Sequence, residues 1–84
     1  MTRIVKLHSR FLGRQNLSFA EFQSLLEAFG YSLDRIKGSH HTYRHPVIGQ
    51  RMQIQPNGKS AKDYQILQFR RIVEKHGLII GPQE

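Results

Sequence analysis

The chain has 84 residues, no cysteine, and 13 Lys and Arg against 6 Asp and Glu, which gives a formal net charge of +7. This length predicts a single domain over residues 1–84 with one modest core, and the missing cysteines exclude disulfides, thiolate zinc sites and cysteine nucleophiles. The charge predicts a polyanionic partner, of which nucleic acid is the commonest. No apolar run is long enough to cross a membrane, so we expect a cytoplasmic protein.

An N-terminal helix is predicted by apolar residues at roughly helical spacing, with Gly13 placed to end it. The apolar residues are Ile4, Leu7, Phe11 and Leu12. We treat residues 1–16 as an N-terminal extension and residues 17–78 as the core of the domain.

A second helix has stronger start and stop signals. Ser18 and Glu21 have the spacing of a capping box, and an apolar stripe with helical period runs to Phe29. Gly30 is placed to end the helix. A stripe of this kind indicates core packing rather than a cofactor site.

Residues 31–55 predict three short strands, because the helical period is lost and turn residues divide the segment. Gly38 and Ser39 form a tight turn between the first two strands. The strands are expected over residues 31–37, 40–45 and 51–55. Leu33 and Ile36 can share one face of the first strand only if a bulge lies between them.

A basic loop and a closing helix are predicted for the last third of the chain. Ser60 or Asp63 is available to cap a helix over residues 61–76, and Gly77 can end it. The apolar tail over residues 78–80 is expected to pack back on the body or to meet a partner.

The predicted order is helix, three-stranded antiparallel meander and helix, preceded by an extra N-terminal helix. This is an α+β arrangement in which helices cover one face of the sheet and leave the other face open. The α-β-β-β-α order is that of the double-stranded RNA-binding fold, and a fold alone does not fix a function.

Three of the five histidines lie in the segment GSHHTYRHP. Strand alternation separates them, because successive side chains point to opposite faces of a sheet. His40 is expected on the open face with Arg44. His41 and His45 are expected on the other face, which Tyr43 anchors to the core.

Strand geometry disfavours a metal site in this segment. His41 and His45 stand about 13 Å apart on one strand face, and an ion with ligands at about 2 Å cannot bridge them. Neither cysteine nor a nearby carboxylate pair completes a ligand set. We therefore expect no metal and no cofactor.

A catalytic role for His40 is chemically simpler. Histidine exchanges a proton near neutral pH, and RNA carries its own nucleophile, the 2′-hydroxyl. His40 can act on that proton while Arg44 or Lys37 stabilises the charge that develops on the phosphate. An exposed histidine without a catalytic role fits the spacing equally well.

The stretch GSHHTY resembles the G-S-H-x-x-[F/Y] signature of the HicA-type toxins, which are small basic mRNA interferases of type II toxin–antitoxin systems. The flanking stretches LLEAFGYSLDRIK and YQILQFRRIVEKHGL are similar to the helix and strand that precede the signature in this family and to its closing helix. The resemblance covers about residues 18–78.

This resemblance implies a double-stranded RNA-binding-like fold, cleavage of mRNA without a metal, and neutralisation by a HicB-type antitoxin, which we expect to be acidic because the toxin is basic. The family's catalytic histidine corresponds to His40, and Gly38 and Ser39 correspond to the turn that presents it. His41 and His45 are not required by the signature.

Phosphate contacts are expected from basic residues near the signature, before the last helix and on it. These residues are Lys37, Arg44, Lys59, Lys62, Arg70 and Arg71. On the last helix, Arg70, Arg71 and Lys75 fit three settings: RNA, an antitoxin contact and a solvated helix face.

The alternative function is a non-catalytic module that binds double-stranded RNA, since the same fold order and charge suit it. Strong salt-dependent RNA binding without cleavage products would select this alternative. The sequence carries no evident lysine cluster at a helix end, which counts against it.

Overall fold

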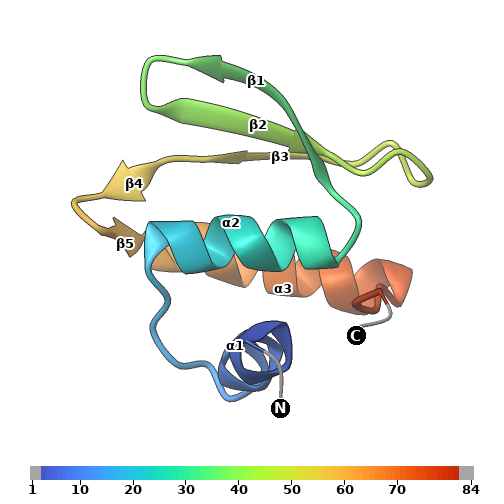
Figure 1. Cartoon of the computed structure of the whole chain (residues 1–84). Helices are drawn as coiled ribbons and strands as arrows, with labels where there is room; N and C mark the ends of the chain where they lie inside the picture. Colours follow the sequence, from blue (N-terminus) through green and yellow to red (C-terminus); the bar gives the residue numbers. More distant parts are fainter. Residues whose placement is uncertain (1–2, 82–84) are drawn as a thin grey trace.

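A computed structural model describes residues 3–81, which form three helices and five strands (Figure 1). The helices are α1 (Arg3–Leu12), α2 (Phe19–Ala28) and α3 (Asp63–His76). The strands are β1 (Ser32–Lys37), β2 (His40–Arg44), β3 (Arg51–Ile54), β4 (Pro56–Asn57) and β5 (Ser60–Ala61). The predicted α+β class and the α-β-β-β-α order with an extra N-terminal helix are confirmed.

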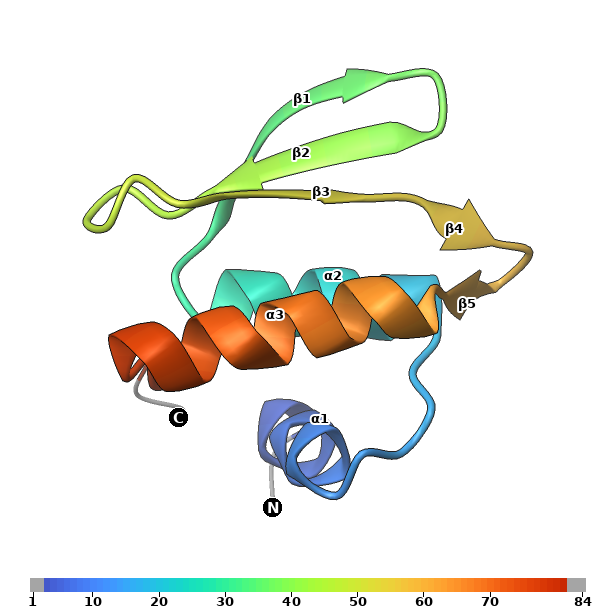
Figure 2. The same ribbon diagram turned by 180° about the vertical axis from the view of Figure 1, so that it is seen from behind.

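Three layers are visible in the molecule. Helices α2 and α3 lie side by side against one face of the β1-β2-β3 sheet, and α1 crosses the far side of this helix pair (Figures 1 and 2). The opposite face of the sheet carries no covering element among the described residues. The fold thus separates an open sheet face on one side from the helices on the other.

Phe69 of α3 is fully buried at the centre of the core. Its ring centroid lies between 5.3 and 5.8 Å from four other aromatic rings, in edge-on or tilted contacts worth roughly 1 kcal/mol each beyond burial. These rings belong to Phe11, Phe22, Phe29 and Tyr31. Because Phe11 comes from α1, the N-terminal helix is part of the same core as the rest of the domain.

The capping box that starts α2 is confirmed. The backbone N–H of Glu21 donates to Ser18 Oγ at 3.1 Å, and the backbone N–H of Ser18 donates to Glu21 Oε1 at 2.8 Å. Arg10 of α1 donates to the second carboxylate oxygen of Glu21 at 2.6 Å. These contacts lower the pKa of Glu21, with the backbone bond at Ser18 as the largest cause.

A bulge in β1 resolves the register of the sheet. Leu33 pairs with Tyr43 and Ile36 pairs with His41, with the irregularity between Leu33 and Arg35. Both apolar residues therefore face the helix side. The sequence predicted that they could share a face only if a bulge lay between them. All of β1 is exposed, because it is an edge strand and stands furthest from the helices (Figure 1).

The basic loop predicted before the last helix is partly ordered as a hairpin. Strands β4 and β5 pair around a turn in which Gly58 has φ 62°. The backbone N–H of Ala61 donates to Leu17 O at 3.1 Å, and the N–H of Phe19 donates to Lys59 O at 2.9 Å. The hairpin thereby fixes the start of α2. Strands of only two residues are too short to be recognised in the sequence.

Helix α3 begins differently from the prediction. It starts at Asp63 rather than residue 61, and its N-cap is Lys62, which makes no side-chain cap bond. Neither Ser60 nor Asp63 is the cap, because Ser60 is held in β5 and Asp63 already has helical conformation. The predicted stop at Gly77 is confirmed by its left-handed φ of 61°.

The first and the last segment of the described region both pack on the helix side of the molecule. Helix α1 ends at Leu12, but Leu12 is 60% exposed rather than part of the core stripe. At the other end Leu78 and Ile80 pack against the core, and Gly81 N–H donates to Ala28 O at 2.9 Å. The apolar tail thus folds back on the body, while Ile79 stays exposed.

Candidate nucleic-acid interface

The open face of the sheet is basic. In β2, the buried Tyr43 points to the helices, so its alternating neighbours point the other way. Side chains of paired residues share a face in an antiparallel sheet, which assigns the residues of β1 and β3 as well. The open-face set is Ser32, Arg35, Lys37, His40, Thr42, Arg44, Arg51 and Gln53.

Four of these eight side chains are permanent cations and none is acidic. Arg35 and Arg51 were not among the residues singled out from the sequence. The signal was present, since Arg35 lies two positions from Lys37 and Arg51 alternates with the buried Met52. Asp34, which the bulge in β1 leaves without a register partner, lines a pocket together with Ser32 and Arg44. Four cations beside this one carboxylate still attract a polyanion such as a nucleic-acid backbone.

His40 begins β2 directly after the hairpin turn. Gly38 has φ 61° while Ser39 has a negative φ, as in a II′ turn with glycine at its first central position. His40 is exposed, and the described residues offer its ring no hydrogen bond or ion pair. Its imidazole nitrogens are therefore available to an external group.

His41 lies on the opposite face, as predicted. Its ring meets Phe19 of α2 edge-on at a centroid distance of 5.1 Å, and its Nδ1 lies 3.1 Å from Ser39 O. Both contacts are structural, because they hold the His41 ring on the helix-facing side of the sheet, next to the β1–β2 turn.

His45 follows β2 and serves the β2–β3 loop. Its Nδ1 accepts from the backbone N–H groups of Val47 and Ile48 at 3.3 and 3.4 Å, which places the ring proton on Nε2. The ring also packs edge-on against Tyr31 at 5.3 Å. No group of three or more potential metal ligands comes together anywhere in residues 3–81.

The other predicted phosphate-binding residues fall in different places. Lys59 is exposed in the β4–β5 turn, and the half-buried Lys62 lies 6.0 Å from the Tyr64 ring centroid. Arg71 is exposed on α3 beside Lys75.

Arg70 is only 9% exposed, with its guanidinium 4.5 Å over the Phe11 ring, so it belongs to the α1–α3 contact rather than to the open face.

A family model described as the HicA toxin of bacterial toxin–antitoxin systems matches residues 19–78. The chain belongs to the HicA toxin family. The match covers α2, the whole sheet and α3, and it leaves α1 outside. No curated protein and no solved structure gives a significant match.

Membership in this family makes the protein a toxin of a bacterial toxin–antitoxin system, which implies an antitoxin partner. The signature stretch GSHHTY lies inside the matched region and forms the β1–β2 turn and the first part of β2. None of the helices within residues 3–81 is long and apolar enough to cross a membrane.

Proposed function

We propose that this HicA-family toxin is a ribonuclease that cleaves mRNA on the open face of its sheet, with His40 as the general base or acid. The observation that carries the proposal is the position of His40, exposed and without a side-chain partner, among the cations of that face. A histidine in this setting can exchange a proton with RNA bound by its phosphates.

In the proposed reaction the 2′-oxygen of a ribose attacks the adjacent phosphorus, and the bond from phosphorus to the 5′-oxygen breaks. The products are a 2′,3′-cyclic phosphate and a free 5′-hydroxyl. His40 takes the proton from the 2′-hydroxyl or gives a proton to the departing 5′-oxygen, and solvent water exchanges the other proton. Its register partner Lys37, together with Arg44, stabilises the negative charge on the pentacoordinate phosphorus. This chemistry uses no metal or cofactor.

Around this centre, Arg35 and Arg51 extend the phosphate-binding face, and Lys59 and Lys62 lie at the β4–β5 end of the molecule. We leave Arg70 out of the RNA contacts because it lies over Phe11 in the α1–α3 contact and not on the open face. Arg71 is exposed on α3 and not on the sheet, so any RNA contact it makes lies outside the open face.

RNA cleavage by the purified protein tests the catalytic proposal. His40→Ala should lower the cleavage rate by a factor of roughly 100 or more, because a positioned general base or acid contributes about that much. The matched control is His76→Ala, which removes an exposed histidine at the end of α3 and should cleave like the wild type. Equal cleavage by folded His40→Ala protein would show that His40 is not the catalytic residue.

A double-stranded RNA-binding module that cuts nothing is the second candidate, because its fold order is the same and the open face is basic. Salt-dependent RNA binding with no products from the wild type would select it.

For the partner, we propose a HicB-type antitoxin with an acidic surface that covers the open face and neutralises its cations.

A further inference from the structure

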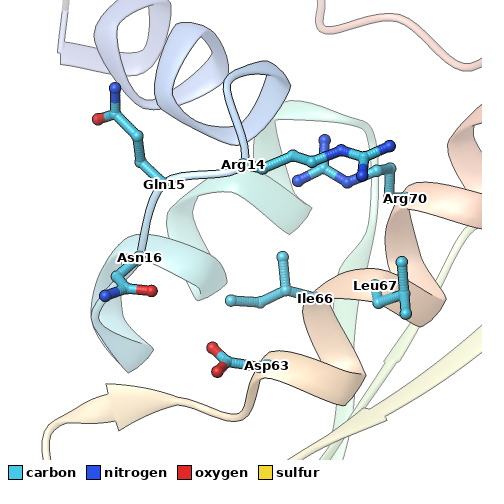
Figure 3. A pocket seen from close by; sticks show the side chains of 7 residues that line it. All are labelled: Arg14, Gln15, Asn16, Asp63, Ile66, Leu67 and Arg70. Atoms are coloured by element: carbon cyan, nitrogen blue, oxygen red, sulfur yellow. The ribbon is translucent and has the colours of Figure 1, made fainter.

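A pocket of about 300 Å³ lies between the loop that follows α1 and the first half of α3 (Figure 3). Residues 14–16 of the loop form one wall, and four residues of α3 form the other. This pocket is lined by none of the open-face residues. Residues 14–16 also lie outside the region that matches the HicA family, so the pocket is built partly from this chain's own N-terminal segment.

Arg70 lines the pocket with a guanidinium that forms no ion pair with the described residues. It is only 9% exposed, and the single ion pair among residues 3–81 joins Arg10 to Glu21 instead. The guanidinium carries five N–H donors, and none of its nitrogens is both fully enclosed and unpaired, so these donors can be reached by a ligand in the pocket. Burial lowers the pKa of Arg70 and the charge of Arg14 lowers it further, while Glu74, one turn along α3, acts in the opposite direction.

Arg14 brings a second positive charge to the same wall. It has φ 59° and is the one non-glycine residue with a positive φ in the described part of the chain. From this left-handed position its side chain extends toward Arg70, and the two guanidinium groups meet at one side of the pocket (Figure 3). Two like charges held together at a strained residue indicate a place where an anion would be stabilised.

The rest of the lining favours one kind of anion. Ile66 is buried and Leu67 is 43% exposed, so an apolar surface adjoins the arginines. Asp63 stands on the other side of Ile66 from the two guanidiniums (Figure 3). A nucleic-acid backbone would bring repeated negative charges toward Asp63, whereas a single carboxylate beside an apolar side chain avoids that repulsion.

We propose that this pocket binds an acidic–apolar segment of a protein partner, with Arg14 and Arg70 holding one carboxylate and Leu67 contacting the neighbouring apolar side chain. The partner to which we assign the segment is the antitoxin, since a toxin of this family requires one. The site is separate from the proposed ribonuclease face and does not depend on His40.

Nuclear magnetic resonance of the side-chain Nε–H groups of Arg14 and Arg70 tests the site directly. The probes are acetyl-Leu-Glu-Leu-amide, its Gln counterpart and a short oligouridylate. The Glu peptide should shift both resonances saturably and bind at least roughly tenfold more tightly than the Gln peptide. Equal effects of the two peptides, no saturable shift with the Glu peptide, or displacement of that peptide by the oligouridylate would overturn the proposal.

Two substitutions at Arg14 test the pocket in the full complex with the antitoxin. Arg14→Gln and Arg14→Gly should each weaken the complex by roughly tenfold, because each removes one of the two cations. Arg3→Gln is the matched control, since it removes an exposed charge from the other end of α1. Antitoxin affinity equal to that of the control would refute the assignment of the partner.

RNA cleavage separates this proposal from the ribonuclease proposal. Free Arg14→Gln toxin should cleave RNA at the wild-type rate, because Arg14 is not on the open face. Loss of cleavage in Arg14→Gln would assign the pocket to RNA and contradict the proposal. A failure of His40→Ala to lower cleavage would overturn the ribonuclease mechanism alone and leave the peptide titration unchanged.

Discussion

Lys37 and His40 are register partners across the β1–β2 turn, so their side chains leave the sheet on the same open face. Directly opposite residues in an antiparallel pair have Cβ atoms about 5 Å apart, within reach of one phosphodiester group. The two-residue turn between them is short, and Gly38 supplies its positive φ. The hairpin therefore presents a proton-exchanging group and a cation together.

The open-face arginines missed from the sequence give the first prediction. Arg35→Gln and Arg51→Gln should each reduce the slope of log binding constant against log salt for RNA by roughly 0.7, since each loses one phosphate contact. Binding measured over a salt series on a single-stranded RNA reports this slope. Arg3→Gln serves as the control, and a slope change no larger than in that control would place the arginine outside the RNA interface.

The capping box at α2 gives a pH-dependent prediction. The native pKa of Glu21 lies below its ordinary value of 4.5, so its contribution to stability is complete above that pH and is lost as the pH falls through the native value. Glutamine can still accept from the Ser18 N–H, so Glu21→Gln removes chiefly the charge beside Arg10 and the helix N-terminus, and it should lower the free energy of unfolding at pH 7 by up to about 1 kcal/mol. Urea unfolding should show this difference shrinking below pH 4.5.

Glu27→Gln is the matched control for that experiment, because Glu27 is an exposed carboxylate on the same helix. It should differ little from the wild type at either pH. A Glu21→Gln difference that stays constant down to low pH would mean that the carboxylate charge is not what stabilises the cap.

Gly30 and His45 should be energetically coupled. Gly30 has φ 98°, and a Cβ there would lie 3.1 Å from His45 Nε2. Gly30→Ala should therefore cost about 1 to 3 kcal/mol of stability, from backbone strain together with the contact. In a His45→Ala background the same change should cost less, because only the backbone strain persists. Additive costs in a double-mutant cycle would contradict this coupling.

Arg14→Gly should stabilise the free protein. Glycine removes the left-handed strain, which costs roughly 1 to 2 kcal/mol for other residues, at an entropic loss of up to about 1 kcal/mol. It also removes a positive charge beside Arg70. A gain of up to about 1 kcal/mol in urea unfolding is expected. A clear loss of stability would mean that Arg14 makes native contacts that outweigh its strain.

Local patterns in the sequence were sufficient for much of the fold. The capping box at Ser18 and the helical stripe that follows depend on neighbours within one or two turns, so they could be read directly. Strand alternation likewise separated His40 from His41, because side chains alternate whatever the rest of the molecule does. The bulge was required as soon as Leu33 and Ile36 were placed on one face.

Other features depended on contacts between distant segments. The β4–β5 hairpin pairs only two residues on each side, and it holds Ser60 in β5 instead of at the cap of α3. Its backbone bonds to Leu17 and Phe19 come from a segment far along the chain. No local period signals strands this short. The assignment of a catalytic role to His40 stays a prediction, since exposure and register supply its position but not its chemistry.

The sequence by itself determined the helices, the alternating faces of the strands and the basic character of the protein, because each follows from spacing between near neighbours or from composition. The tertiary structure decided how the charges are divided. It gathered Arg35 and Arg51 with His40 on the sheet, and it buried Arg70 over Phe11 when α1 packed across α3. Helical spacing already places Arg70 closer than Arg71 to the apolar stripe, since Arg70 follows Ile66 by four residues and precedes Val73 by three, but only the packing of α1 from far along the chain puts the Phe11 ring against its guanidinium.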